Sequence, residues 1–206
     1  MNRHRHRPMM RRLAFSALLA SLVSGCVSVQ PPVWSAPAAE ADLNYQQVYE
    51  DWTHKKVHYD QLNAQTTAEA TYLSPRFIAA LVEHQGESEG LPEDKVKALR
   101  AARVSQANKE AKFLVAIATQ EMRWDDLDQP ESTMRIVLRE GAREIEPLSL
   151  VKLTRREITV QRLYYPHIGP LSNAYWVTFP APTEPKHVVL RIAGPPGYVD
   201  LTWKSR

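Results

Sequence analysis

The chain has 206 residues, with 26 Lys and Arg against 23 Asp and Glu, and a formal net charge of +3. Five arginines and no acid lie in residues 1–25, so the other 181 residues carry 21 basic and 23 acidic side chains, a net charge of −2. This balance argues against a basic surface for nucleic acid, and we expect no nucleic-acid partner. A chain of this size suits a single domain.

The first 25 residues have the pattern of an export signal. Five arginines lie in residues 1–12, and residues 13–22 (LAFSALLASL) are almost entirely apolar. A basic segment followed by a short apolar one is typical of a signal peptide, and about ten apolar residues are too few to span a bilayer, which needs about 20. We expect residues 1–25 to be a signal peptide, with either Met1 or Met10 as the true start.

The chain has one cysteine, and Val23-Ser24-Gly25-Cys26 resembles the lipobox of bacterial lipoproteins. The resemblance implies cleavage between Gly25 and Cys26 and a diacylglyceryl group on the Cys26 thiol. Two or three acyl chains hold a protein firmly at a membrane. Val27 stands where an Asp would imply retention in the inner membrane, so we expect an anchor at the outer membrane, on its periplasmic face. An ordinary secretory peptide is the alternative.

The remaining chain divides into a tether and one domain. Residues 26–42 carry the Cys and are rich in Pro and Ala, with Pro31, Pro32 and Pro37 interrupting regular structure. Residues 43–206 form the expected single globular domain. Three helices are expected in its first part, over about 43–62, 75–86 and 92–108. The first would bury an aromatic face of Tyr45, Val48, Tyr49, Trp52 and Tyr59, while Ser74 would cap the second and Gly86 would end it.

Strands are expected over about 64–73 and within 111–204. Residues 113–119 (FLVAIAT) read as a central strand, and later segments alternate apolar and polar residues between turn signals. One such segment contains Ile158 and Val160. Another contains Val199, Leu201 and Trp203, whose side chains should point into the core. The sequence therefore predicts a mainly β, α+β fold: an Ig-like antiparallel β-sandwich with an N-terminal helix and a helical insertion.

Two segments contain residue types that bind metals. His54 and His58 lie four apart on the expected first helix, a spacing that can begin a zinc site, but Lys55 and Lys56 lie between them and no general-base Glu does. An acidic segment surrounds Trp124 but lacks the alternation and the turn glycine of an EF-hand loop; its members are Glu121, Asp125, Asp126, Asp128 and Glu131. We expect solvated side chains at both places, no metal and no cofactor.

The segment from Tyr164 to Pro170 (YYPHIGP) combines two tyrosines, an imidazole and two prolines. Rigid aromatic loops on sandwiches often contact partners, so Tyr164, Tyr165 and His167 are candidate partner-binding residues. The alternative is that Tyr164 or Tyr165 packs inward and the prolines only shape a crossover.

Several short motifs are similar to those of uncharacterised lipoproteins of Gram-negative bacteria, over roughly residues 50–206. They are Tyr72-Leu73-Ser74-Pro75-x-Phe77, Trp124-x-Asp126-Leu127, Glu146-Pro147, Tyr164-Tyr165-Pro166, Tyr175-x-Val177-x-Phe179-Pro180 and Gly194-Pro195-x-Gly197-x-x-x-Leu201-Thr202-Trp203. The resemblance supports location and fold and implies no activity.

The sequence shows no catalytic constellation. A GxSxG elbow, a phosphate-binding loop and a GxGxxG motif are all missing, and the only thiol is the one that the lipobox would acylate. We therefore expect a non-catalytic protein that is bound to the membrane by its lipid and that binds a protein or envelope component. A periplasmic hydrolase whose site is assembled from distant residues is the alternative.

Overall fold

The computed structural model describes residues 40–169, 172–183 and 187–204 of one compact unit that spans residues 37–206. The expected signal peptide, Cys26 and the tether up to residue 39 lie outside the described residues. In chain order the described elements are α1 (Glu40–Trp52), β1 (Thr53–Asp60), β2 (Asn63–Tyr72), α2 (Pro75–Ser88), α3 (Glu93–Ala107), β3 (Glu110–Thr119), η1 (Met122–Trp124), β4 (Arg135–Glu140), β5 (Arg143–Ile145), β6 (Ser149–Lys152), α4 (Arg155–Gln161), β7 (Asn173–Pro180), β8 (His187–Gly194) and β9 (Gly197–Lys204).

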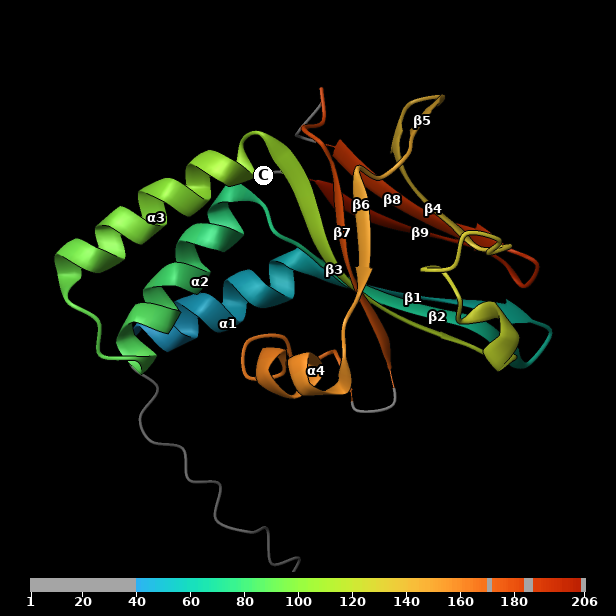
Figure 1. Cartoon of the computed structure of the whole chain (residues 1–206), viewed down its shortest axis with the longest axis horizontal. Coiled ribbons are helices and arrows are strands. Elements are labelled where there is room, and N and C mark those ends of the chain that lie inside the picture. Colours follow the sequence, from blue (N-terminus) through green and yellow to red (C-terminus); the bar gives the residue numbers. More distant parts are fainter. Residues whose placement is uncertain (1–39, 170–171, 184–186, 205–206) are drawn as a thin grey trace, which may run out of the picture. The chain divides into compact units, whose positions relative to one another are not determined.

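The strands form two antiparallel sheets. The larger sheet has the order β1-β2-β3-β7-β6 and the smaller one β5-β4-β8-β9. Helices α2 and α3 are inserted between the paired strands β2 and β3, as expected. In Figure 1 the helices and the smaller sheet lie on opposite sides of strands β3 and β7. This confirms the α+β class with two antiparallel sheets, as in a sandwich.

Two hydrophobic cores occupy the two faces of the larger sheet. The sheet-side core, toward the smaller sheet, consists of Ala68, Ala70, Tyr72, Ala111, Phe113, Val115, Ile117, Met134, Ile136, Leu138, Tyr175, Val177, Phe179, Val188, Leu190, Ile192, Val199, Leu201 and Trp203. The helix-side core, toward the helices, consists of Tyr45, Val48, Tyr49, Leu73, Phe77, Ile78, Leu81, Val82, Val96, Leu114, Ala116, Leu153, Ile158, Tyr165, Ile168 and Ala174. Successive residues of β3 alternate between these cores, which explains its unbroken apolar run.

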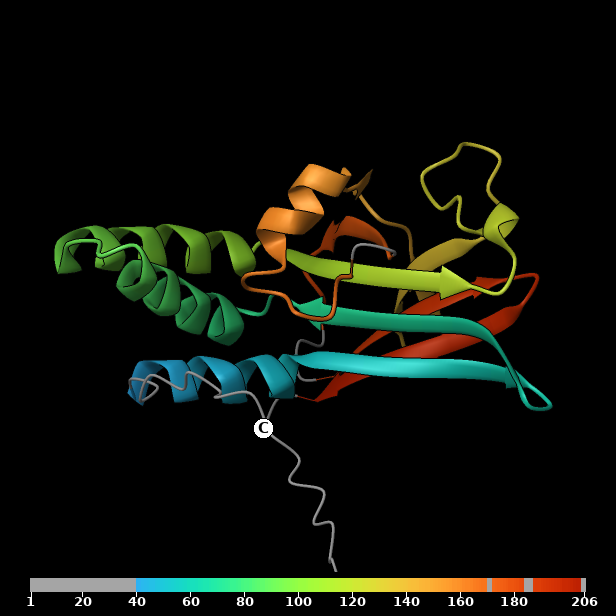
Figure 2. The same ribbon diagram turned by 90° about the horizontal axis from the view of Figure 1, so that it is seen from below.

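The expected helix over 43–62 is wrong in its second half. Helix α1 ends at Trp52, and Thr53–Asp60 forms β1, which pairs along its length with β2. Figure 2 shows α1 running directly into β1. The helical spacing that included Tyr59 was a coincidence, because Tyr59 lies on β1 and is mostly exposed. Strands β1 and β2 form a hairpin that turns at Gln61 and Leu62, and helical periodicity does not register this cross-strand pairing.

Two smaller expectations are also wrong. Ile158 and Val160 belong to α4 rather than to a strand, and a capping box of Thr154 and Glu157 begins this helix. Gly86 lies inside α2, where a Cβ would come 2.5 Å from Cγ2 of Val96 on α3, so it permits the two helices to pack closely. The Ser74 cap and the inward phase of the last strand follow expectation: Ser74 accepts a hydrogen bond from the Phe77 amide, and Trp203 is 2% exposed.

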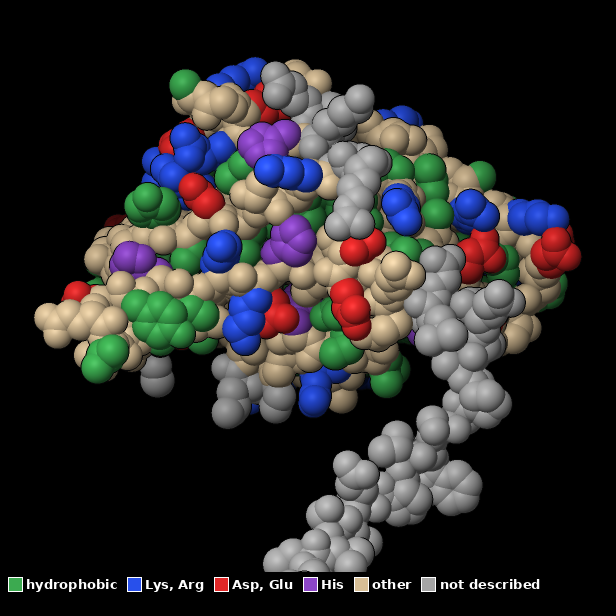
Figure 3. All heavy atoms as spheres, turned by 180° about the vertical axis from the view of Figure 1, so that it is seen from behind, with side chains coloured by type: hydrophobic (Ala, Val, Ile, Leu, Met, Phe, Trp, Pro, Cys, Tyr) green, Lys and Arg blue, Asp and Glu red, His purple; other side chains and the backbone are tan. Residues whose placement is uncertain are grey.

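The surface of the described residues is mixed in charge. Figure 3 shows Lys and Arg side chains interspersed with Asp and Glu side chains on the face that it draws, without one sign covering it. Among the described helices, none has the length and the apolar character needed to cross a membrane.

Candidate functional site

A hollow of about 710 Å³ lies where the end of α1, the start of β1, the start of α2 and the end of β9 meet. The residues that line it are Glu50, Asp51, Trp52, His54, Arg76, Thr202, Trp203 and Lys204. Its volume lies within the range of ligand sites, which is about 300–1,000 Å³. It combines aromatic walls with charges of both signs, and we take it as the candidate site.

Three aromatic residues of the lining, Trp52, His54 and Trp203, are held in place by contacts with one another and with Tyr72. The rings of His54 and Trp203 are stacked, with centroids 5.2 Å apart and planes 6° apart. The Trp203 indole N–H donates to the backbone carbonyl of Trp52 at 2.8 Å, and the Trp52 ring meets Tyr72 edge-on at 5.5 Å. His54 and Trp52 are half-buried, so these contacts hold each ring in place while part of it remains exposed.

The charged residues at the two helix ends of the hollow have the sign that the helix dipole disfavours. Glu50 and Asp51 lie in the last turn of α1, whose C-terminal end is already negative, and Arg76 lies in the first turn of α2, whose N-terminal end is positive. Such placements cost roughly 0.3–1 kcal/mol each at a surface. Within the described ranges Asp51, Arg76 and Lys204 have no hydrogen bond or ion pair through their side chains, whereas Glu50 accepts one from Gln46 at 2.7 Å. Helix stability therefore does not account for these charges.

The structure separates His54 from His58. Both lie on β1 rather than on a helix, and four residues along a strand span about 13 Å. His58 lies against the β8–β9 turn, where a Cβ on Gly197, at φ +113°, would come 2.3 Å from the His58 Nε2. The part of the chain that the structure describes contains no group of three or more His, Cys, Asp or Glu arranged to hold a metal ion.

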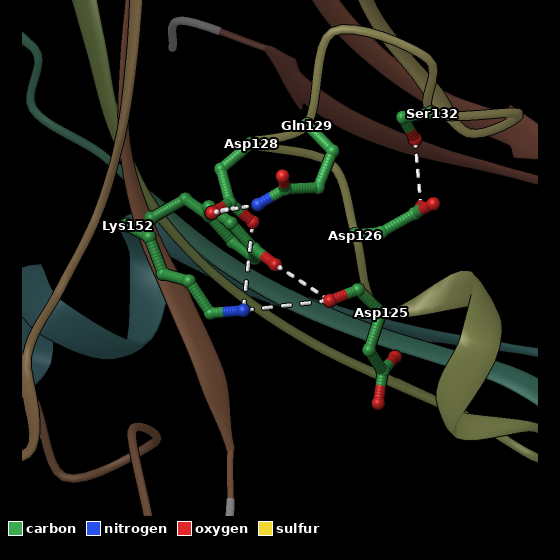
Figure 4. Close-up of polar contacts among 7 residues, drawn as sticks. Asp125, Asp126, Asp128, Gln129, Ser132 and Lys152 are labelled. Carbon is green, nitrogen blue, oxygen red and sulfur yellow. Dashed lines mark hydrogen bonds and ion pairs between the residues drawn. The ribbon is translucent and has the colours of Figure 1, made fainter.

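In the acidic segment after β3, the carboxylates of Asp125 and Asp126 accept hydrogen bonds from other residues of the domain. One carboxylate oxygen of Asp125 accepts from the Thr119 backbone N–H at 3.2 Å and from its hydroxyl at 2.8 Å. Asp126 accepts from the Ser132 hydroxyl at 2.8 Å. These bonds give the two carboxylates different partners, and Figure 4 shows the Asp125 carboxylate pointing away from the bonded pair of Asp126 and Ser132.

Lys152 of β6, the edge strand of the larger sheet, contacts the loop that contains Asp125 and Asp128. Its Nζ lies 3.5 Å from a carboxylate oxygen of Asp128 and donates to the Asp125 backbone carbonyl at 3.4 Å. Trp124 packs, partly buried, against the sheet-side core. The geometry is that of an inter-strand loop with a docked Trp.

Residues 164–169 of the Tyr164–Pro170 segment hold α1 on the helix-side core, while Pro170 lies outside the described residues. Tyr165 is only 3% exposed, so a partner could not touch it without a rearrangement. The Tyr45 hydroxyl donates to the Tyr164 backbone carbonyl at 2.5 Å, and the Tyr49 hydroxyl lies 2.9 Å from the His167 Nδ1. Tyr164 and His167 are half-buried, so they are the members of the predicted set that retain some exposure.

Burial changes the protonation of His167. It lowers the pKa of the imidazole to about 4, while the backbone carbonyl of Leu114 favours the charged ring and offsets this only in part. Nε2 is buried, and no described atom forms a geometrically acceptable hydrogen bond with it. His167 is therefore neutral at neutral pH, and its ring serves the packing of α1.

Sequence reasoning missed the hollow because its residues come from segments 50–54, 76 and 202–204, which only the tertiary structure brings together. Only half of the charge signal was available: Arg76 opposes the dipole at the predicted start of the second helix, but Glu50 and Asp51 lay inside a helix that was expected to continue to residue 62. Comparison with models of protein families, with curated proteins and with solved structures found no match.

Proposed function

We propose that this protein is a lipid-anchored lipoprotein of the bacterial envelope whose domain faces the periplasm and binds an envelope component or protein without catalysis. The single observation that carries the binding role is the hollow, which is lined by half-buried Trp52 and His54 and by Asp51, Arg76 and Lys204, whose charges have no partner among the described residues. The lipobox resemblance at Val23–Cys26 supports the anchor, and Val27 supports the outer membrane.

We propose further that the two sheets are an Ig-like sandwich that serves as a rigid platform for this hollow. What supports the likeness is two antiparallel sheets that share one core, with Trp203 as its largest fully buried side chain. The loops and helix ends around the edge of such a platform are where binding residues usually lie.

The surroundings of His54 favour binding over hydrolysis. A hydrolytic nucleophile needs a hydrogen-bonded base, and that base needs a group that orients it. The His54 ring is instead stacked on Trp203, and no described Ser, Thr or Tyr hydroxyl donates to it. A non-catalytic role is therefore the one we propose.

The anchor is tested by replacing Cys26 with Ser. Without the thiol no thioether can form, so we expect the precursor to remain uncleaved and metabolic labelling with palmitate to disappear. Palmitate label on the Cys26→Ser protein would refute the lipobox assignment.

The binding role is tested by recovering partners of the lipidated protein from its own envelope and identifying them by mass spectrometry. Asp51→Asn and Arg76→Gln change exposed side chains without partners, so we expect normal stability and reduced recovery. Asp94→Asn and Arg162→Gln are matched controls, because both side chains are exposed and lie outside the hollow. Equal recovery with all four variants would exclude the hollow as the binding site.

A further inference from the structure

We propose that the hollow binds a short peptide by its two free ends, the ammonium group beside the end of α1 and the carboxylate beside the start of α2. This inference rests on the proposed binding function and specifies the ligand. It follows from the distribution of charge in the hollow, because opposite charges there come from different elements and do not neutralise one another.

The end of α1 forms a subsite for a cation. The last backbone carbonyls of a helix carry a partial negative charge, and Glu50 and Asp51 add two carboxylates at the same end. The last turn of α1 contains no basic residue, and Asp51 has no partner among the described residues. An ammonium group placed here would meet the concentrated negative charge and form charge-assisted hydrogen bonds.

The start of α2 forms a subsite for an anion. Its first turn contains no acid, and the Arg76 guanidinium group there has no partner in the part of the chain that the structure describes. A guanidinium group binds a carboxylate with two parallel hydrogen bonds. Lys204, at the end of β9, adds a second unpaired cation to the lining.

The aromatic part of the lining suits a peptide chain. Trp52 and His54 offer half-buried ring faces, and such faces pack against aliphatic side chains and against planar amide groups. The lining therefore matches a ligand that is zwitterionic at its ends and apolar or planar in between. A simple anion or a simple cation would leave half of these charges unused.

The test measures binding of trialanine by titration calorimetry, with N-acetyl-trialanine and trialanine amide as blocked forms. We expect trialanine to bind and each blocked form to bind about tenfold more weakly, since each lacks one charge-assisted contact. Asp51→Asn should weaken trialanine by a similar factor but leave N-acetyl-trialanine unchanged. Arg76→Gln should weaken trialanine but leave trialanine amide unchanged.

The controls separate this inference from the binding function itself. Asp94→Asn and Arg162→Gln should bind trialanine like the unaltered protein. Equal affinity for free and blocked peptides, or no binding of trialanine, would overturn the peptide assignment. Recovery of envelope partners that depends on Asp51 and Arg76 would then still uphold the hollow as a site. Binding to vesicles of phosphatidylethanolamine but not to trialanine would likewise overturn the peptide assignment in favour of a zwitterionic lipid headgroup.

Discussion

The two faces of the larger sheet bury their side chains in different ways. The sheet-side core is made almost wholly of alternating strand residues, and its few polar atoms belong to aromatic rings such as Tyr175 and Trp203. The helix-side core combines aliphatic residues with tyrosines, and the two tyrosines of α1 bond to another element, Tyr45 to the Tyr164 carbonyl and Tyr49 to the His167 ring. The difference teaches that buried polar atoms find partners on both sides of the sheet, but in different ways. In the sheet-side core the Trp203 indole and the Tyr175 hydroxyl each donate to one backbone carbonyl, whereas in the helix-side core two tyrosines join α1 to the Tyr164 loop.

The largest effect should come from the sheet-side core. Trp203→Ala removes a large buried side chain and leaves the Trp52 carbonyl without its indole donor, so we expect a loss of about 3–5 kcal/mol in the free energy of unfolding. Urea unfolding measures this. Tyr198→Ala on the same strand is the control, because Tyr198 is 56% exposed and its loss should cost well under 1 kcal/mol. Similar costs for both variants would contradict the difference between the two faces of β9.

The helix-side core should be the one that responds to pH. The folded pKa of His167, about 4, lies below its ordinary value of 6.5, so between these values the unfolded chain binds more protons. Stability from this residue is therefore complete above about pH 6.5 and declines as the pH falls toward 4, by at most about 3 kcal/mol. Urea unfolding at pH 7.5 and pH 4.5 measures the decline.

A variant tests whether His167 causes that decline. His167→Asn should remove most of the loss between the two pH values, while His187→Asn, at an exposed position on β8, should keep it. An unchanged decline in His167→Asn would show that another group is responsible and that His167 takes up protons in the folded state.

A smaller effect is expected from the bond between α1 and the Tyr164 loop. Burial raises the pKa of Tyr45, so its hydroxyl stays protonated and donates to the Tyr164 carbonyl. Tyr45→Phe keeps the ring and removes this bond, at a cost of about 1 kcal/mol. Tyr59→Phe is the control, because Tyr59 is exposed on β1 and its change should leave the melting temperature within a degree. No effect of Tyr45→Phe would show that the carbonyl finds another donor.

The smallest effect should come from the ion pair at the edge of the larger sheet. Lys152 lies 3.5 Å from Asp128 at the surface, and exposed pairs contribute about 0–1 kcal/mol. Lys152→Met should therefore lower the free energy of unfolding by less than 1 kcal/mol, and 0.5 M salt should reduce even that difference. A larger loss would show that Lys152 holds the whole Asp125–Asp128 loop in place.

Much of the architecture followed from local signals. Strands β3, β7 and β9 were predictable because β3 is an unbroken apolar run and burial on one face of a sheet has a period of two. The start of α2 was predictable because a helix start needs a side-chain acceptor, which Ser74 provides. Strand β1 and helix α4 were not predicted. Pairing with β2 overrode the helical spacing of β1, and the Thr154–Glu157 capping box outweighed the alternation of α4.

The sequence by itself therefore determined the resemblance to an exported lipoprotein, the α+β class and the inward phase of Trp203, since each depends on residues close together in the chain. Only the tertiary structure decided that α1 ends where β1 begins, that Tyr165 is buried, and that Trp52, Arg76 and Lys204 line one hollow. The physical reason is that the hollow joins residues from both ends of the domain. Their proximity depends on how the sheets and helices pack, and no short-range pattern encodes that packing.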